Sequence, residues 1–187
     1  MYRRLLTAAL LAAAIALPAA ANSSEEFHAT FSGFNEVGGL GAGETGAILS
    51  EGKGQLTLKL DRVNQTLWFE LTYSGLSSPV VQSHIHLGKN HVAGGIMVFF
   101  CSNNNVAGVQ PCPASGGTVT GTITASDVLA ITGQNVTGGD FDALTDALES
   151  NTAYANIHTM KFPAGEIRGQ IHHADHHDRD HEHDHDR

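Results

Sequence analysis

The sequence has few aromatic residues, only two cysteines and little positive charge. Lys and Arg number 10 against 19 Asp and Glu, which gives a formal net charge of −9 at pH 7. This charge argues against nucleic acid as a partner, and it would be repelled by an anionic membrane surface. Aromatic residues make up 6% of the chain, whereas there are 21 glycines. Together with frequent Val, Thr and Ile, that composition favours short strands joined by tight turns.

Long apolar runs are also missing, except near the N-terminus. A basic start at Arg3 and Arg4 precedes an apolar stretch from Leu5 to Leu17, and Ala19–Ala21 follows with small residues. Because about 20 apolar residues are needed to span a bilayer, this shorter run favours a signal peptide over a membrane anchor. We expect residues 1–21 to be removed on export to the periplasm or beyond. Residues 22–187 are then one domain's worth of chain without a membrane span.

Cys101 and Cys112 enclose the loop-like segment "SNNNVAGVQP". An exported protein meets an oxidising compartment, so these residues are expected to form a disulfide. A thiolate metal site is the alternative, but the sequence has no CxxC pattern to favour it.

Alternation of apolar and polar residues predicts most of the secondary structure. The clearest unit is "KGQLTLKLDRVNQTLWFELTYSGL", which is typical of a β-hairpin. Further strands are expected in "FHATFSGF", "VVQSHIHLG", "GGIMVFFC", "GGTVTGTITAS", "TAYANIHTM" and "GEIRGQIHH". The continuous apolar run "GGIMVFFC" indicates a central strand or one buried on both faces.

Two short helices are expected between these strands. Ser126 is a suitable N-cap for "DVLA", and Asp140 for a helix with an apolar stripe of Phe141, Leu144 and Leu148. The pattern predicts an all-β fold: an antiparallel, Greek-key-like β-sandwich of roughly seven or eight strands with one or two short helices.

The last 16 residues differ in composition from the rest. Residues 172–187 contain six carboxylates, almost no apolar residues and seven of the 12 histidines: His172, His173, His176, His177, His181, His183 and His185. Such a segment cannot bury enough apolar surface to fold alone. We expect a disordered tail that scavenges metal ions, with a solvated charge run as the alternative.

The strand "VVQSHIHLG" carries His84 and His86 two residues apart, so both side chains project from one face. Their Cα atoms are then about 6.5–7 Å apart, which one metal ion can bridge. His158, on a strand late in the chain, is the expected third ligand, and His28 or His91 could complete the set. Ordinary sheet positions are the alternative for all of these histidines. Met97 is a candidate soft axial ligand, although its apolar run favours a place in the core.

Glu166 and Arg168 are two apart in "PAGEIRGQ" and therefore share a strand face. They are expected to pair with each other or with turn backbone groups, as structural residues rather than as a ligand-recognition pair.

Three stretches together resemble the CHRD family, the domain first named from chordin: "FHATFSGFNEV", "LWFELTYSGLSSPVVQSHIHLG" and "NIHTMKFPAGEIRGQI". The similarity covers about residues 27–171. It implies a secreted or periplasmic all-β domain, and it does not imply a settled activity. The H-x-H strand and the later N-I-H-T place the family pattern on His84, His86 and His158. The glycines after "NEV" depart from the family, where a proline pair is common.

The sequence therefore predicts an exported protein that binds a transition metal, copper first and zinc second, through strand histidines and a histidine-rich tail. A structural or protein-interaction module without a metal site is the alternative, with another exported protein as partner. A copper redox enzyme is the third reading, based only on similarity of layout to Cu/Zn superoxide dismutase.

Overall fold

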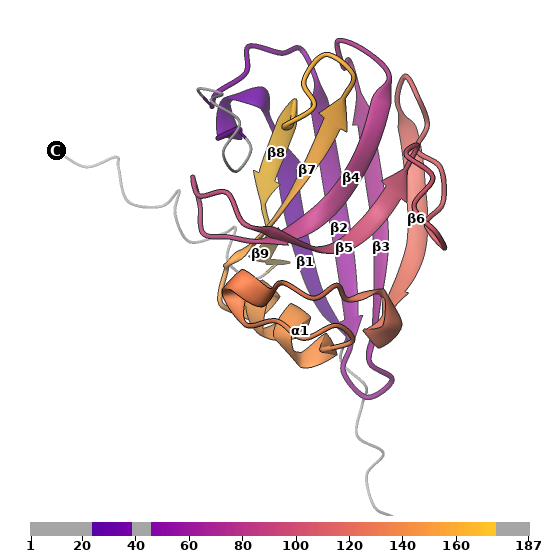
Figure 1. Ribbon diagram of the computed structural model, residues 1–187, viewed down its shortest axis with the longest axis vertical. Helices are drawn as coiled ribbons and strands as arrows, with labels where there is room; N and C mark the ends of the chain where they lie inside the picture. Colours follow the sequence, from indigo (N-terminus) through magenta and orange to yellow (C-terminus); the bar gives the residue numbers. More distant parts are fainter. Residues whose placement is uncertain (1–23, 39–45, 175–187) are drawn as a thin grey trace, which may run out of the picture.

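The structure is a computed structural model that describes residues 24–38 and 46–174 (Figure 1). Two antiparallel sheets pack face to face. One has the order β6-β3-β2-β1-β9 and the other β5-β4-β7-β8. The larger sheet contains β1 (Glu25–Phe31), β2 (Lys53–Asp61), β3 (Thr66–Ser74), β6 (Gly117–Thr124) and β9 (His172–His173). The smaller contains β4 (Val80–Leu87), β5 (Gly95–Ser102), β7 (Ala153–Thr159) and β8 (Ile167–Gln170). The expected antiparallel β-sandwich is confirmed.

The predicted hairpin forms from β2 and β3. Their register places Leu58 opposite Phe69 and Leu56 opposite Leu71. All four side chains are buried, since alternation turns every second residue toward the other sheet. Burial of each such side chain contributes about 1.5–3 kcal/mol.

The apolar strand β5 lies at an edge of its sheet and not in its centre, but the alternative expectation of burial on both faces holds for its interior. Met97, Val98 and Phe100 are nevertheless buried. The reason is that the segment after β5 folds back over this edge. Gln110 donates hydrogen bonds from one amide nitrogen to the carbonyls of Phe100 and Thr120, which lie in different sheets.

The helix α1 (Phe141–Glu149) lies across the lower end of the sandwich in Figure 1. Asp140 caps it as expected, because its Oδ1 accepts a hydrogen bond from the Ala143 N–H at 2.9 Å. Phe141, Leu144 and Leu148 pack in the core.

The second expected helix, capped by Ser126, does not form. Residues Ala125–Asp127 instead make one turn of 3-10 helix, η2. The Asp127 carboxylate accepts hydrogen bonds from the backbone N–H and hydroxyl of Thr124. Thr124 is therefore the N-cap, and the turn begins two residues before the expected helix and ends at Asp127. The other 3-10 turns are η1 (Gly33–Asn35) and η3 (Thr132–Gln134).

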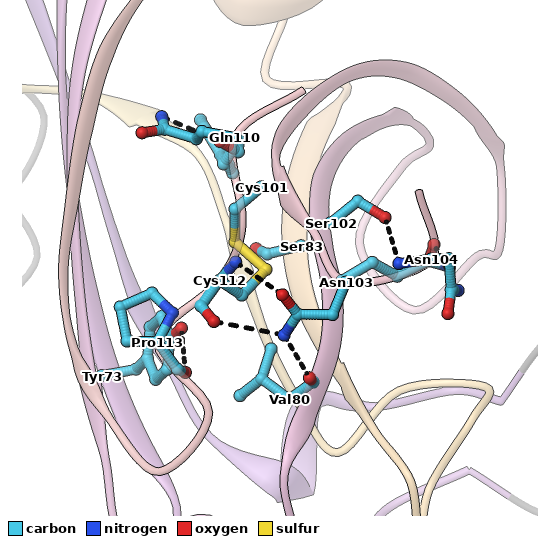
Figure 2. Close-up of a disulfide and its surroundings, with 12 residues drawn as sticks. Tyr73, Val80, Ser83, Cys101, Ser102, Asn103, Asn104, Gln110, Cys112 and Pro113 are labelled. Atoms are coloured by element: carbon cyan, nitrogen blue, oxygen red, sulfur yellow. Dashed lines mark hydrogen bonds between the residues drawn. A yellow bond between two sulfur atoms is a disulfide. The ribbon is translucent and has the colours of Figure 1, made fainter. Parts of the chain in front are cut away.

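Cys101 and Cys112 form the expected disulfide, which ties β5 to the loop that follows it (Figure 2). Asn103 holds the same loop. Its amide nitrogen donates to the carbonyls of Val80 and Cys112, and its amide oxygen accepts from the Cys112 N–H (Figure 2).

His172 and His173 belong to strand β9, so the tail does not begin at residue 172. They pair with His28 and Phe27 of β1, and the His173 ring packs edge-on against Phe27 with centroids 5.0 Å apart. The remaining tail histidines and the expected signal peptide lie outside the described residues. Within residues 24–38 and 46–174, no helix is long and apolar enough to cross a membrane.

Candidate metal centre

The three histidines expected to bind metal lie together on the face of the smaller sheet that points away from the larger one. The β4–β7 register places His84 opposite Asn156 and His158 opposite Gln82. Strand alternation then puts His84, His86 and His158 on one face, while Ile85 and Ile157 point into the core. Bulges on either side of the pair His84–Ile85 interrupt the ladder to β5, and bulges re-aim the side chains near them.

One ring nitrogen from each histidine lies within 4.8 Å of the other two. The ring centroids of His84 and His158 are 4.5 Å apart, and those of His84 and His86 are 4.6 Å apart. All three side chains are buried, His84 completely. Within the described part of the chain, no fourth histidine, cysteine or carboxylate joins the group.

Backbone carbonyls fix the tautomers of two of these rings. Nδ1 of His86 lies 2.8 Å from the Gly94 carbonyl oxygen, and Nδ1 of His158 lies 2.8 Å from that of Pro163. A carbonyl only accepts, so each Nδ1 carries the proton and donates it. In the neutral ring, each Nε2 then presents a lone pair, which is the arrangement that metal-binding histidines use.

Both of these Nε2 atoms face the side chain of Asn156. Its amide oxygen is placed 3.1 Å from Nε2 of His86 and 3.0 Å from Nε2 of His158. An oxygen cannot donate to either lone pair, whereas the amide nitrogen in the same place would donate to both. We therefore assign the nitrogen to this position. In either orientation, the two lone pairs converge on one point.

His84 has no such partners. It is fully buried, and neither ring nitrogen makes a hydrogen bond, although the ring of Phe99 packs edge-on against it at 5.1 Å. Leaving a buried donor or acceptor unpaired costs about 1–3 kcal/mol. A bound metal ion would satisfy one of these nitrogens.

The surroundings keep all three rings neutral. Burial lowers the pKa of His84 well below its usual 6.5, and the neighbouring His158 and His86 lower it further, against a smaller opposing effect of the Asn156 side chain. Burial also lowers the pKa of His86 to about 4 and depresses that of His158, although the hydrogen bonds to backbone carbonyls oppose the change. Metal ligation requires neutral imidazole, so these rings do not have to lose protons near pH 7.

A layered stack supports His86 from one side. The Tyr154 ring lies between the His86 imidazole, with centroids 4.6 Å apart, and the Arg168 guanidinium, 3.4 Å from its centroid. Arg168 donates from one terminal nitrogen to the carbonyls of Lys89 and Val92. This fixes the loop between β4 and β5 over the histidines.

Glu166 and Arg168 do not pair with each other. The Glu166 carboxylate instead accepts hydrogen bonds from the hydroxyls of Ser50 and Thr159 and from both the N–H and hydroxyl of Ser77. Of the two arrangements expected, pairing of the two charges with each other does not occur. The expected contact with turn backbone is found for both residues.

The other candidate ligands lie elsewhere. His28 is on β1 of the opposite sheet, where it contacts Glu26 and Thr57. His91 is exposed in the loop after β4 and has φ of 60°, and Met97 packs in the hydrophobic core. Of the tail histidines, His172 and His173 lie on β9, across the sandwich from the site.

Asn156 and Tyr154 were missed at the level of sequence. A signal was present, because Tyr154, Asn156 and His158 alternate along "YANIH" and must share a face once the segment is a strand. Only the pairing of β7 with β4 brings that face beside His84 and His86.

The donor set fits a transition metal. Metal–nitrogen bonds of about 2.0–2.1 Å in tetrahedral geometry place ligand nitrogens about 3.3 Å apart. The observed separations of up to 4.8 Å require the rings to approach one another on binding, with Asn156 moving aside.

Comparison with known protein families identifies the domain. The CHRD domain model matches residues 27–171. No curated protein and no solved structure gives a match. The matched region includes all three site histidines and covers most of the chain. The protein therefore belongs to the CHRD domain family.

Proposed function

We propose that this CHRD domain is an exported metal-binding protein that holds one transition-metal ion through His84, His86 and His158. The observation that carries the proposal is His84, whose two ring nitrogens are buried without a hydrogen bond. The centroid of its ring lies 4.5–4.6 Å from the centroids of the two other rings. Protein interiors rarely leave such groups unpaired without a reason. Coordination of an ion at the point where the Nε2 lone pairs converge supplies one.

Copper is the first candidate and zinc the second. Imidazole suits both ions, and copper binds a given nitrogen site more tightly than zinc in the usual order of divalent affinities. The set is three neutral histidines without a thiolate or carboxylate, which disfavours magnesium and calcium, since those ions select oxygen ligands.

Export and the tail complete the proposal. The disulfide supports folding in an oxidising compartment, either the periplasm or the exterior. Residues 175–187 add five histidines to the chain. In our proposal this segment collects metal ions loosely and raises their concentration near the folded site.

The test is a competition assay with Cu(II) and Zn(II) on the full-length protein. Histidines 176, 177, 181, 183 and 185 are replaced by Asn in every sample, so that binding by the tail does not obscure the folded site. We expect one equivalent of tightly bound metal, its loss in His84→Ala and in His158→Ala, and its retention in the exposed control His91→Ala.

The competing function is a protein-interaction module without metal. Equal metal content in His84→Ala, His158→Ala and His91→Ala, with all three folded by circular dichroism, would establish that alternative.

A further inference from the structure

A pocket of about 300 Å³ opens directly beside the three histidines. On the sheet side it is lined by His86, Asn156 and His158, while His84 does not reach it. Loop residues complete the lining, among them Ala93, Gly94, Ala164 and Glu36. A metal ion held by the three rings would therefore have His84 behind it and the pocket in front.

Small residues keep this pocket open. Gly94 passes so close to β4 that a Cβ atom there would overlap the Leu87 carbonyl. This glycine is therefore required, and it leaves the wall without a side chain. Ala93 and Ala164 add only methyl groups. Because a water molecule takes about 30 Å³ of liquid volume, the pocket has room for a ligand of several atoms.

In the described part of the chain, no fourth side chain joins the three histidines, since Glu36 lines the pocket but lies outside this group. Within residues 24–38 and 46–174, the group contains three histidines and no further histidine, cysteine or carboxylate. The Asn156 amide is nearest, but carbonyl oxygens suit calcium and magnesium better than copper or zinc. Three-histidine sites with a vacant fourth position are the type that binds water or substrate, whereas structural sites use four protein ligands.

Charge selects the class of ligand. Three neutral imidazoles leave the full double charge on a divalent ion, and the Arg168 guanidinium lies behind Tyr154. Glu36, which also lines the pocket, carries one negative charge and offsets only part of this positive charge. A small anion is therefore favoured over a cation or a neutral base.

We infer that the metal's fourth coordination position faces this pocket and binds one small exogenous anion directly. The inference rests on the proposed metal site and extends it from storage of an ion to recognition of a ligand by that ion.

The probe is azide, added to full-length protein that carries the five tail substitutions and one equivalent of Cu(II). We expect a new ligand-to-metal charge-transfer band and a changed electron paramagnetic resonance spectrum, saturating at one azide per copper. Gel filtration in the presence of azide is the control: copper that elutes with the protein shows that azide has not removed the ion from it.

Two substitutions fill the pocket and leave every histidine in place, Ala164→Leu and Ala93→Leu. Each is expected to weaken azide binding by roughly tenfold or more while one copper stays bound. The matched control is Ala107→Leu, which adds the same side chain at an exposed position in the loop after β5 and should leave azide binding unchanged.

Azide that leaves both spectra unchanged, with copper still bound, would overturn the inference and indicate a site closed by Asn156 or another protein group. Azide binding that is equal in Ala164→Leu, Ala93→Leu and Ala107→Leu would also overturn it. If the protein binds no copper, or if His84→Ala binds as much copper as the protein with His84, the proposed function itself is overturned.

Discussion

The imidazole of His86 lies parallel to the phenol ring of Tyr154, with an angle of 3° between the ring planes. The Tyr154 hydroxyl also accepts a hydrogen bond from the Gly94 N–H at 3.2 Å, and the Gly94 carbonyl accepts from His86. Tyr154 therefore holds both the His86 ring and the loop whose carbonyl fixes the tautomer of that ring.

Substitutions of Tyr154 should separate these two roles. Tyr154→Phe keeps the stack and loses one hydrogen bond, so it should lower the free energy of unfolding by about 1 kcal/mol. Tyr154→Leu also loses the aromatic contacts with His86 and Arg168. This variant should therefore lower the free energy of unfolding by about 2–4 kcal/mol and weaken metal binding. Urea unfolding and metal competition measure these effects, with exposed Val63→Ala as control. Equal effects of Tyr154→Phe and Tyr154→Leu would show that the ring stack contributes neither to stability nor to metal binding.

The metal-free protein should lose stability in mild acid. The pKa of His86 is about 4 when folded and 6.5 in the reference state, so between these values the unfolded chain binds a proton that the folded chain does not. The free energy of unfolding should therefore fall as the pH falls from 6.5 toward 4, by roughly 3 kcal/mol from His86 alone. His84 and His158 add in the same direction.

Denaturant unfolding across this pH range measures the effect. His86→Gln should flatten the profile, whereas His91→Gln should leave it as in the wild type. A wild-type profile that is level between pH 6.5 and 4 would contradict the assigned burial of the rings.

Glu166 joins four segments at one end of the sandwich, so Glu166→Gln should be strongly destabilising. Burial alone would raise the pKa of this carboxyl, but the hydrogen bonds from Ser50, Thr159 and Ser77 outweigh it and hold the pKa below 4.5. Its stabilising effect is therefore present above pH 4.5 and is lost as the pH falls through the lowered folded value. At pH 7 we expect a loss of about 2–4 kcal/mol, because hydrogen bonds to a charged group are the strong ones.

The matched control is Glu70→Gln on the exposed face of β3, which should change the free energy of unfolding by less than about 0.5 kcal/mol. Similar small changes for both variants would rule out the structural role of Glu166.

The disulfide should stabilise the fold modestly and leave metal binding intact. The two cysteines are 11 residues apart, so the closed loop is short, and Cys101→Ser with Cys112→Ser should cost about 2–3 kcal/mol. Asn103 still holds the loop through three hydrogen bonds. Thermal unfolding and metal content of the double variant measure both effects. Loss of the bound metal in a folded double variant would show that the disulfide also positions His84.

The sequence by itself determined the local features. The period-two pattern of β2 and β3 fixed the hairpin and its buried face, and Asp140 fixed the start of α1. The same period placed His84 and His86 on one face before any partner strand was known. These predictions succeeded because strand alternation and helix capping depend on neighbouring residues only.

Only the tertiary structure decided which distant residues meet. Pairing of β7 with β4 selected His158 and excluded His28 and His91, and it brought Asn156 and Tyr154 into the site. The folded-back loop made β5 a buried edge strand, and β1 recruited His172 and His173 into β9. These outcomes depend on contacts between segments far apart in the chain, for which local periodicity carries no information. The burial that keeps three imidazoles neutral exists only after both sheets and their loops have assembled.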